Sequence, residues 1–200
     1  MTKADYDELV ADREPALGIV EANLKVLNRI YEISEIKTRI KTLDSIEEKC
    51  ARKGINFDST EEVRSRIRDV AGARIVCIFK DDIPKIVNAI KQMPGIAVDT
   101  EKDYVSNPKE NGYTSYHIGA FVQVSIPGKG IKSIPVEIQI RTKAMDSWSS
   151  AEHFIKYKTV LMTESEVSER FARLSKLLAK VDEEFMDLRN YCNELKKPAE

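Results

Sequence analysis

The sequence predicts an α+β fold, in which a mixed central sheet of about five strands is flanked by helices and followed by a long C-terminal helix. Three observations support this prediction. Residues 134–142 alternate apolar and polar side chains, as a strand with one buried face does. An almost wholly apolar strand at 74–79 precedes an amphipathic helical pattern at 83–90 and a further strand from 96. From 167 to 195, apolar residues recur in an unbroken heptad pattern.

These segments divide the chain into three parts. We expect an N-terminal helix within 1–34, the sheet-bearing domain at 35–160 and the heptad helix at 161–200. The N-terminus is charged, no apolar run is long enough to cross a membrane, and the three cysteines lack a CxxC spacing. We therefore expect a cytoplasmic protein without a membrane partner, and its two histidines are too few for a histidine-rich metal site.

The first part of the chain is expected to be helical. An apolar stripe with spacings of three and four runs through 17–31, and Pro15 would occupy the first turn of that helix. A second helical pattern follows at 36–46, with Arg39 and Lys41 on its other faces. These two cations would not share a helix face, yet they could enclose a polyanion from two sides. A basic run of this kind is more often an ordinary solvated face.

An acidic residue is expected at the edge of the sheet. Ser59 and Glu62 form a capping-box pattern that begins a third helix. Asp69 would then lie at the entrance of the strand at 74–79, where Gly72 permits a close approach of the backbone.

A polar loop at 106–115 leads into the following strand. Tyr113 could stack on a nucleotide base, while Lys109 and His117 could reach phosphates. The same residues fit an ordinary hairpin, because Asn-Gly turns commonly join strands. These residues alone leave both interpretations open.

The polar face of the strand at 134–142 carries an acid, an amide and a guanidinium. Glu137, Gln139 and Arg141 project from it at strand spacing, and together such groups can hold a metal, a hydroxyl and a phosphate. A solvated outer face has the same alternation and is the commoner reading of an isolated strand.

Helical patterns return after Thr142. Thr163 and Glu166 form another capping box before the heptad helix. We expect that helix to pack against 17–31 of the same chain or of a neighbouring subunit. Its long apolar stripe favours subunit contacts, in a dimer or a tetramer.

A series of short motifs follows in a fixed order between 35 and 158: Arg39-Ile-Lys41, Glu48-Lys-Cys-Ala-Arg-Lys-Gly54, Asp69-Val-Ala-Gly-Ala-Arg74, Lys102-Asp-Tyr104, Asn107-Pro-Lys-Glu-Asn-Gly-Tyr113 with Ser115 and His117, Glu137-Ile-Gln-Ile-Arg-Thr142, Trp148 and Glu152-His153. Each motif alone is weak, but the full set in this order is specific. The set resembles the RelA/SpoT-type alarmone synthetases, in particular the small stand-alone members of that family.

The resemblance implies a pyrophosphokinase that moves the β,γ-pyrophosphate of ATP to the ribose 3′-hydroxyl of GTP or GDP, with (p)ppGpp and AMP as products. It implies that Arg39 and Arg74 sandwich the adenine. By the same resemblance, Lys41, Lys49 and Arg52 hold the ATP phosphates. Transfer of a phosphoryl-type group is mostly positioning and charge stabilisation, which suits such a set of cations.

The resemblance also implies a magnesium clamp and an acceptor site. Asp69 and Glu137 would be catalytic and would bind Mg²⁺, and Glu137 would help to deprotonate the 3′-hydroxyl. Tyr113 would stack on the guanine. The acceptor nucleotide would be surrounded by Lys102, Lys109, Asn111, Tyr113, His117, Gln139 and Glu152.

Two departures from the family pattern and two rival functions stay open. Thr114 stands where many relatives have a basic residue, which leaves the choice between GTP and GDP open. Ile36 replaces an aromatic residue found in relatives with an allosteric alarmone site. Some small relatives act as toxins that pyrophosphorylate the 3′ end of tRNA, and such a protein could have an antitoxin partner. The non-enzymatic rival is an RNA- or nucleotide-binding module, although such a binder gains nothing from two acids in its site.

Overall fold

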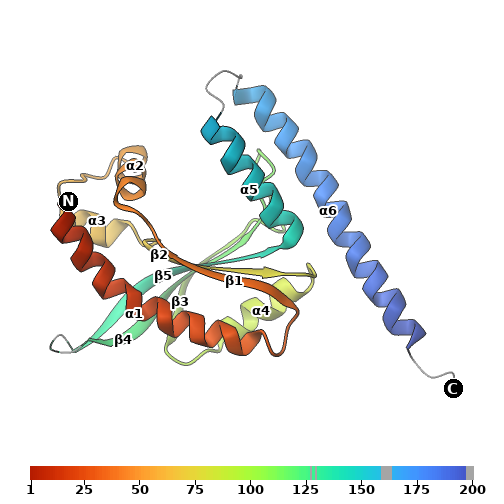
Figure 1. The fold of residues 1–200 in the computed structure, drawn as a ribbon, viewed down its shortest axis with the longest axis horizontal. Coiled ribbons are helices and arrows are strands. Elements are labelled where there is room, and N and C mark those ends of the chain that lie inside the picture. The colour runs from red at the N-terminus through yellow and green to blue at the C-terminus, as the bar shows by residue number, and fades with distance from the viewer. Residues whose placement is uncertain (127, 129, 159–163, 197–200) are drawn as a thin grey trace.

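A computed structural model of the chain describes residues 1–126, 128, 130–158 and 164–196 (Figure 1). Its centre is a five-stranded sheet with the order β1-β2-β5-β4-β3. The pair β2 and β5 is parallel and the other pairs are antiparallel, so the sheet is mixed, as predicted. The strands are β1 (Ile33–Ile40), β2 (Ala71–Cys77), β3 (Ile96–Asp103), β4 (Tyr116–Ile126) and β5 (Gly130–Thr142).

Helices lie on both faces of the sheet, which confirms the α+β prediction (Figure 1). The helices α1 and α4 cover one face, α2 and α3 lie near one end of the other face, and α5 and α6 lie near its opposite end. Their bounds are α1 (Lys3–Leu27), α2 (Leu43–Lys53), α3 (Thr60–Arg66), α4 (Asp82–Lys91), α5 (Lys143–Lys158) and α6 (Glu164–Leu195). Among the helices of the described chain, none is both long and apolar enough to span a membrane.

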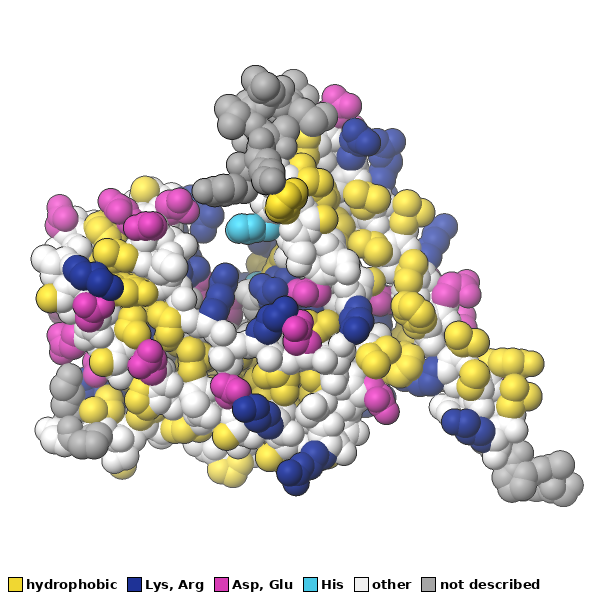
Figure 2. Space-filling model, in the orientation of Figure 1, with side chains coloured by type: hydrophobic (Ala, Val, Ile, Leu, Met, Phe, Trp, Pro, Cys, Tyr) yellow, Lys and Arg dark blue, Asp and Glu magenta, His cyan; other side chains and the backbone are white. Residues whose placement is uncertain are grey.

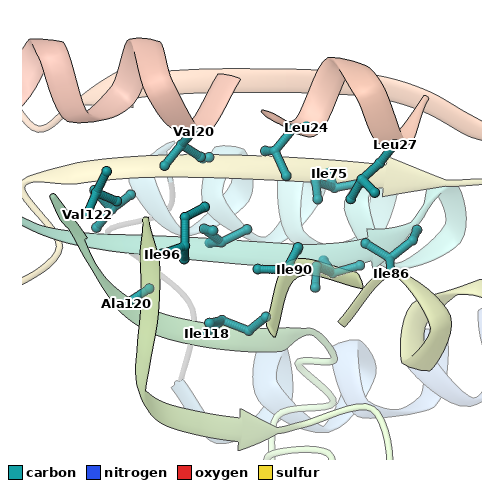
Figure 3. Close-up of a cluster of buried hydrophobic side chains, with 14 of the residues drawn as sticks. Val20, Leu24, Leu27, Ile75, Ile86, Ile90, Ile96, Ile118, Ala120 and Val122 are labelled. Carbon is teal, nitrogen blue, oxygen red and sulfur yellow. The ribbon is translucent and has the colours of Figure 1, made fainter. Parts of the chain in front are cut away.

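The main core lies between the sheet and the helices α1 and α4 (Figure 3). Leu24 of α1, Ile90 of α4 and Ile118 of β4 are completely buried there. Ile138 of β5 is also completely buried in this core. Burial of each such side chain contributes about 1.5–3 kcal/mol to the free energy of unfolding. Helices α1 and α4 cover this face of the sheet, so polar residues of the sheet project from the opposite face.

The predicted helix at 36–46 is wrong. Residues up to Ile40 form β1, and α2 begins only at Leu43, after Thr42 accepts a hydrogen bond from the Ser45 amide. The apolar residues Ile36 and Ile40 are four apart, a spacing that fits a helix face and also a strand face with period two. The strand has a functional consequence, because Lys37 and Arg39, two residues apart, now share one face of the sheet.

The N-terminal helix begins twelve residues before the position that Pro15 suggested, at Lys3, and Pro15 lies inside it. Thr2 and Asp5 form its capping box: the Thr2 hydroxyl accepts from the Asp5 amide at 3.2 Å, and the Asp5 carboxylate accepts from the Thr2 amide at 2.8 Å. Ser59 is confirmed as the N-cap, since its hydroxyl accepts from the Glu62 amide. The capping box is not complete there, because the Ser59 amide donates to Asn56 O instead of to the Glu62 side chain. The one predicted at Thr163 lies outside the described residues.

The heptad helix is confirmed as α6, but α1 of the same chain is not its partner. Instead, α1 buries its stripe against the sheet, and α6 packs mainly on α5. Much of the α6 stripe is bare, as the hydrophobic side chains along this helix show in Figure 2. Leu174, Phe185 and Leu188 are 47%, 48% and 58% exposed. The predicted subunit contact stays a prediction.

Candidate active site

Two rows of side chains cross the face of the sheet opposite α1 and α4. The first row consists of Arg39, Gly72, Glu137, Gly119 and Thr100. The second row consists of Lys37, Arg74, Gln139, His117 and Lys102. Residues that are neighbours in register share one face of a sheet, so segments distant in the sequence bring one acid and several cations together.

Glu137 lies between two glycines, Gly72 on β2 and Gly119 on β4. A Cβ atom at Gly119 would lie 2.4 Å from the Thr100 hydroxyl, which leaves no room for a side chain without a shift. At Gly72, by contrast, an added Cβ atom would meet nothing nearer than 3.8 Å. Glu137 therefore has open space on its β2 side, and on its β4 side Gly119 allows Thr100 to pack closely.

Asp69 lies just before β2 and is held by two lysines. Its Oδ2 atom accepts a hydrogen bond from Lys49 and lies 3.2 Å from the Lys41 ammonium group. Burial raises the pKa of Asp69, but the hydrogen bond from Lys49 and the charge of Lys41 lower it by more than burial raises it. The net shift of the pKa is therefore downward. Its other oxygen, Oδ1, is buried and has no hydrogen-bond partner among the described residues. One acceptor of this ionised carboxylate is thus left for a ligand.

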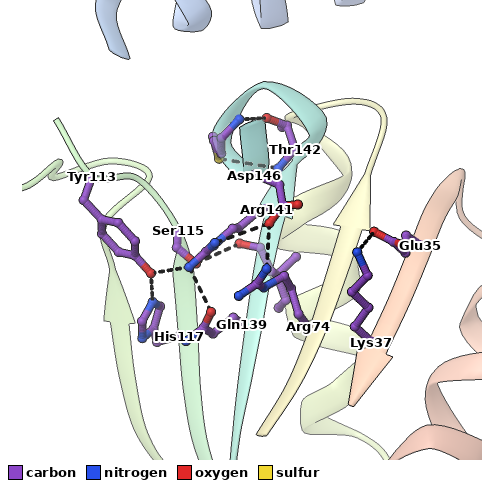
Figure 4. Close-up of polar contacts among 12 residues, drawn as sticks. Glu35, Lys37, Arg74, Tyr113, Ser115, His117, Gln139, Arg141, Thr142 and Asp146 are labelled. Atoms are coloured by element: carbon purple, nitrogen blue, oxygen red, sulfur yellow. Dashed lines mark hydrogen bonds and ion pairs between the residues drawn. The ribbon is translucent and has the colours of Figure 1, made fainter. Parts of the chain in front are cut away.

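A chain of hydrogen bonds runs from Arg141 through Tyr113 to His117 (Figure 4), and His117 contacts Glu137. Arg141 can only donate, and its Nη2 atom lies 2.7 Å from the Tyr113 hydroxyl oxygen. The Tyr113 proton is then free to point at His117 Nε2, 2.7 Å away. The other ring nitrogen, Nδ1, can then donate to Glu137 Oε1, which is 3.0 Å away. Burial raises the pKa of Glu137, but the hydrogen bond from His117 opposes it and the net shift is downward.

Two cavities meet at the two carboxylates. The β1-side cavity, of about 280 Å³, is lined by Lys37, Thr38, Arg39, Asp69, Gly72, Ala73, Arg74, Glu137 and Gln139. The β3-side cavity, of about 260 Å³, has both acids in its wall together with Lys49, Lys102 and His117. Figure 2 shows the corresponding hollow, with Lys and Arg side chains gathered around it between the α2–α3 side and α5. Two acids at the border of two basic cavities can serve two polyanions at once.

The 106–115 loop forms one side of this region. Within it, Asn111 donates to Glu152 of α5 at 3.1 Å, and the Lys109 ammonium lies 5.1 Å from the centroid of the Tyr113 ring. A cation over the face of an aromatic ring is an attractive contact. The loop therefore places Tyr113 between Lys109 and the hydrogen-bond chain that leads through His117 to Glu137.

Gly112 packs this loop directly onto α6. Its φ angle is +88°, and an added Cβ atom would lie 2.7 Å from Ser175 Cβ and 2.9 Å from Ala172 Cα. Only glycine satisfies both the left-handed backbone and the close approach. The position of the loop is therefore tied to α6.

The structure brings together most of the residues expected in the site. Asp69, Glu137, Lys49 and the basic and polar residues of the two sheet rows line the two cavities. The described residues that line these cavities do not include the expected residues Lys41, Arg52, Lys109, Asn111, Tyr113 and Glu152. The roles of all the expected site residues stay predictions.

The spacing of the strand at 134–142 placed Arg141 on one face with Glu137 and Gln139, as a group that could hold a phosphate, but Asp146 received no role from the sequence. Asp146 lies in the first turn of α5 and accepts from Arg141 at 3.3 Å and from Arg74 at 3.1 Å. No local sequence signal marks it, because its partners come from two other strands.

The donor set fits a divalent cation shared with a nucleotide. The charge of Asp69 opposes ionisation of Glu137, and a cation between the two carboxylates would relieve that repulsion. Among the described residues, no cluster of three or more His, Cys, Asp and Glu could hold a metal by itself. Mg²⁺ is commonly bound by one or two carboxylates plus substrate phosphates, so two acids are sufficient here.

The lowered pKa values predict an acid-dependent loss of stability. The folded chain favours the ionised forms of Asp69 and Glu137, so their pKa values in the folded chain lie below the usual values of 3.8 and 4.5. Their stabilising contribution is thus present above pH 4.5 and is lost as pH falls through the folded values. We expect the gap in urea midpoint between the native chain and Glu137→Gln to shrink below pH 4.5. A gap that widens on acidification would contradict the shift.

The sequence of this chain is similar to those of known proteins. A region found in RelA and SpoT proteins matches residues 38–161. GTP pyrophosphokinase YwaC of Bacillus subtilis strain 168 is 32% identical over 181 residues, which cover 87% of this chain and 85% of YwaC. GTP pyrophosphokinase YjbM of the same strain is 30% identical over 201 residues, which cover 97% of this chain and 93% of YjbM.

Solved structures give the same grouping. The small alarmone synthetase 1 of Bacillus subtilis, bound to its product pppGpp, superposes with a TM-score of 0.85 and 29% identity over 96% of this chain and 100% of that chain. A structure of the same enzyme bound to AMPCPP has a TM-score of 0.76 and 28% identity, again over 96% of this chain and 100% of the other.

Proposed function

Because the chain belongs to the family that shares the region found in RelA and SpoT proteins, we propose that it is a GTP or GDP pyrophosphokinase that makes (p)ppGpp. The relatives named above are GTP pyrophosphokinases, and one of them is bound to pppGpp. The observation that carries the proposal is the position of Asp69 and Glu137 at the border of two basic cavities. Transfer between two nucleotides requires such a shared border.

ATP occupies the β1-side cavity in this proposal. Arg39 and Arg74 line it from neighbouring strands and enclose the adenine between their guanidinium planes. Lys41 and Lys49 hold the phosphates near Asp69, to which both are bonded in the free chain. Arg52 at the end of α2 reaches the same phosphates. Each lysine exchanges the Asp69 carboxylate for a phosphate when ATP binds. Because both ammonium groups are already largely buried, they lose little additional hydration.

The acceptor nucleotide occupies the region between Tyr113 and the β3-side cavity. Tyr113 stacks on the guanine. The phosphates and ribose of the acceptor nucleotide are surrounded by Lys102, Lys109, Asn111, His117, Gln139 and Glu152. Glu137 accepts the proton of the 3′-hydroxyl. The 3′-oxygen then attacks the β-phosphorus of ATP, the bond from that phosphorus to the oxygen bridging to the α-phosphate breaks, and AMP leaves.

Asp69 and Glu137 are also the proposed ligands of Mg²⁺. The unpartnered Asp69 Oδ1 and the repulsion between the two acids support this assignment. A bound magnesium ion supplies charge neutralisation for the phosphates during transfer. Glu137 therefore acts both as the proton acceptor and as a magnesium ligand. The contact with His117 orients its carboxylate for both roles.

The direct test offers the purified chain γ-labelled ATP with GDP, GTP and deacylated tRNA in separate reactions. We expect label in ppGpp and pppGpp and one AMP formed for each transfer. Label on tRNA alone would establish the toxin-type alternative, for which an antitoxin partner would then be sought. Nucleotide binding without magnesium and without turnover would establish the binding module.

We further propose that α6 joins subunits into a dimer or tetramer. Its exposed stripe, which includes Phe185 and Leu188, supports this assembly. The double substitution Phe185→Lys with Leu188→Lys should reduce the mass measured by light scattering to that of one chain. Glu183→Lys, exposed on the same helix but on the side opposite this stripe, should not change the mass. A native chain that is monomeric at every concentration would contradict the assembly. The cytoplasmic location stays a prediction from the cysteine pattern and the family.

A further inference from the structure

Arg141 is a buried cation that the proposed transfer does not use. Its side chain is 3% exposed. It donates to the Tyr113 hydroxyl at 2.7 Å, to Gln139 Oε1 at 2.9 Å, to Ser115 Oγ at 3.3 Å and to Asp146 Oδ1 at 3.3 Å. A buried guanidinium is costly unless its donors are satisfied, so this arrangement holds Arg141 in one orientation.

Asp146 shares a single oxygen between two cations. Its Oδ1 atom accepts from Arg141 on β5 and from Arg74 on β2, at 3.3 Å and 3.1 Å. Arg74 Nε is buried and has no hydrogen-bond partner among the described residues, so the polar capacity of Arg74 is only partly used. A ligand in the β1-side cavity can therefore draw Arg74 away from Asp146.

These contacts form a continuous chain between the two nucleotide sites (Figure 4). It begins at Arg74 in the β1-side cavity, passes through Asp146 and Arg141, and reaches Tyr113 in the 106–115 loop. From Tyr113 it continues through His117 to Glu137. One end contacts the proposed ATP site, and the other ends at the proposed base.

We propose that Asp146 and Arg141 are positioning residues that couple the two sites, so that ATP strengthens binding of the acceptor nucleotide. This inference rests on the proposed function. When adenine draws Arg74 onto its ring, Asp146 Oδ1 is left to Arg141 alone. Arg141 is then held more firmly against the Tyr113 hydroxyl, and the ring is fixed for stacking. By thermodynamic reciprocity the acceptor strengthens ATP binding by the same factor.

The test is calorimetric titration with GDP in the presence and absence of α,β-methylene ATP, which blocks cleavage at the reacting bond. In the native chain we expect the ATP analogue to tighten GDP binding by about fivefold or more, within the usual range of coupling between sites. In Asp146→Asn the factor should fall below about twofold, because a neutral amide holds Arg141 more weakly. Both ligands should still bind separately.

Asp81→Asn is the matched control. Asp81 pairs with Arg189 at 2.9 Å, away from both cavities, so its loss should leave the coupling factor unchanged. If Asp146→Asn does not unfold cooperatively, Arg141→Lys replaces it, since one ammonium nitrogen cannot occupy the separate positions from which the Arg141 nitrogens reach Tyr113 and Asp146. An absent coupling in the native chain, or a native factor in a folded variant, would overturn the proposal. A native chain that binds neither nucleotide would instead refute the proposed function.

Discussion

Glu137→Gln should lower kcat for pyrophosphate transfer by about a thousandfold or more, while the chain stays folded. The amide cannot take a proton from the 3′-hydroxyl and is a poor ligand for a hard cation. The fold should survive because the amide oxygen can still accept from His117 Nδ1, as Glu137 Oε1 does at 3.0 Å. The measurement is AMP release from ATP and GDP, together with a circular dichroism melt.

Glu101→Gln provides the matched control for this prediction. Glu101 of β3 pairs with Ile118 on the opposite face of the sheet from Glu137 and accepts from Lys91 and Tyr116. Removal of its charge should leave kcat within about twofold, since exposed ion pairs contribute little. Turnover by a folded Glu137→Gln variant at a rate close to the native one would remove Glu137 from the role of base.

Gly112→Ala should raise the KM for the acceptor nucleotide about tenfold and leave the KM for ATP unchanged. The left-handed backbone, with φ at +88°, costs an alanine about 1–2 kcal/mol. The added methyl group would also lie 2.7 Å from Ser175 Cβ, so the loop must move away from α6 and carry Tyr113 with it. ATP lies on the other side of Glu137 in this account. Steady-state kinetics with each substrate varied separately measures the difference.

Gly95→Ala separates backbone strain from contact with α6. Gly95 has a φ angle of +77°, and an added Cβ atom there would meet nothing within 4 Å. This variant should lose stability through the same strain and keep both KM values. Equal increases in both KM values for Gly112→Ala would contradict the assigned role of the loop.

Local patterns in the sequence predicted much of the fold, because many elements have a clear period or cap. The alternation around Glu137 predicted β5, and the heptads through Phe171 predicted α6. The error at β1 arose because Ile36 and Ile40 satisfy both periods. The start of α1 was missed because Asp5, rather than Glu or Gln, completes its capping box.

The site depended on information that no local pattern contains. Strand order and register bring Glu137 beside Gly72 and Gly119, and pairing of distant strands is set by the whole core. The family motifs supplied the acids and most of the cations in advance. Asp146 was found only in the structure, because its importance comes from two arginines on different strands.

We expect Asp69 and Glu137 to hold one divalent ion between the two nucleotides. Titration of Mn²⁺ in the presence of α,β-methylene ATP, followed by electron paramagnetic resonance, measures this binding. The native chain should have one strong site, which is weakened at least about tenfold in Asp69→Asn and in Glu137→Gln alike, because each variant removes one of two charged ligands. Native Mn²⁺ affinity in either variant would contradict it.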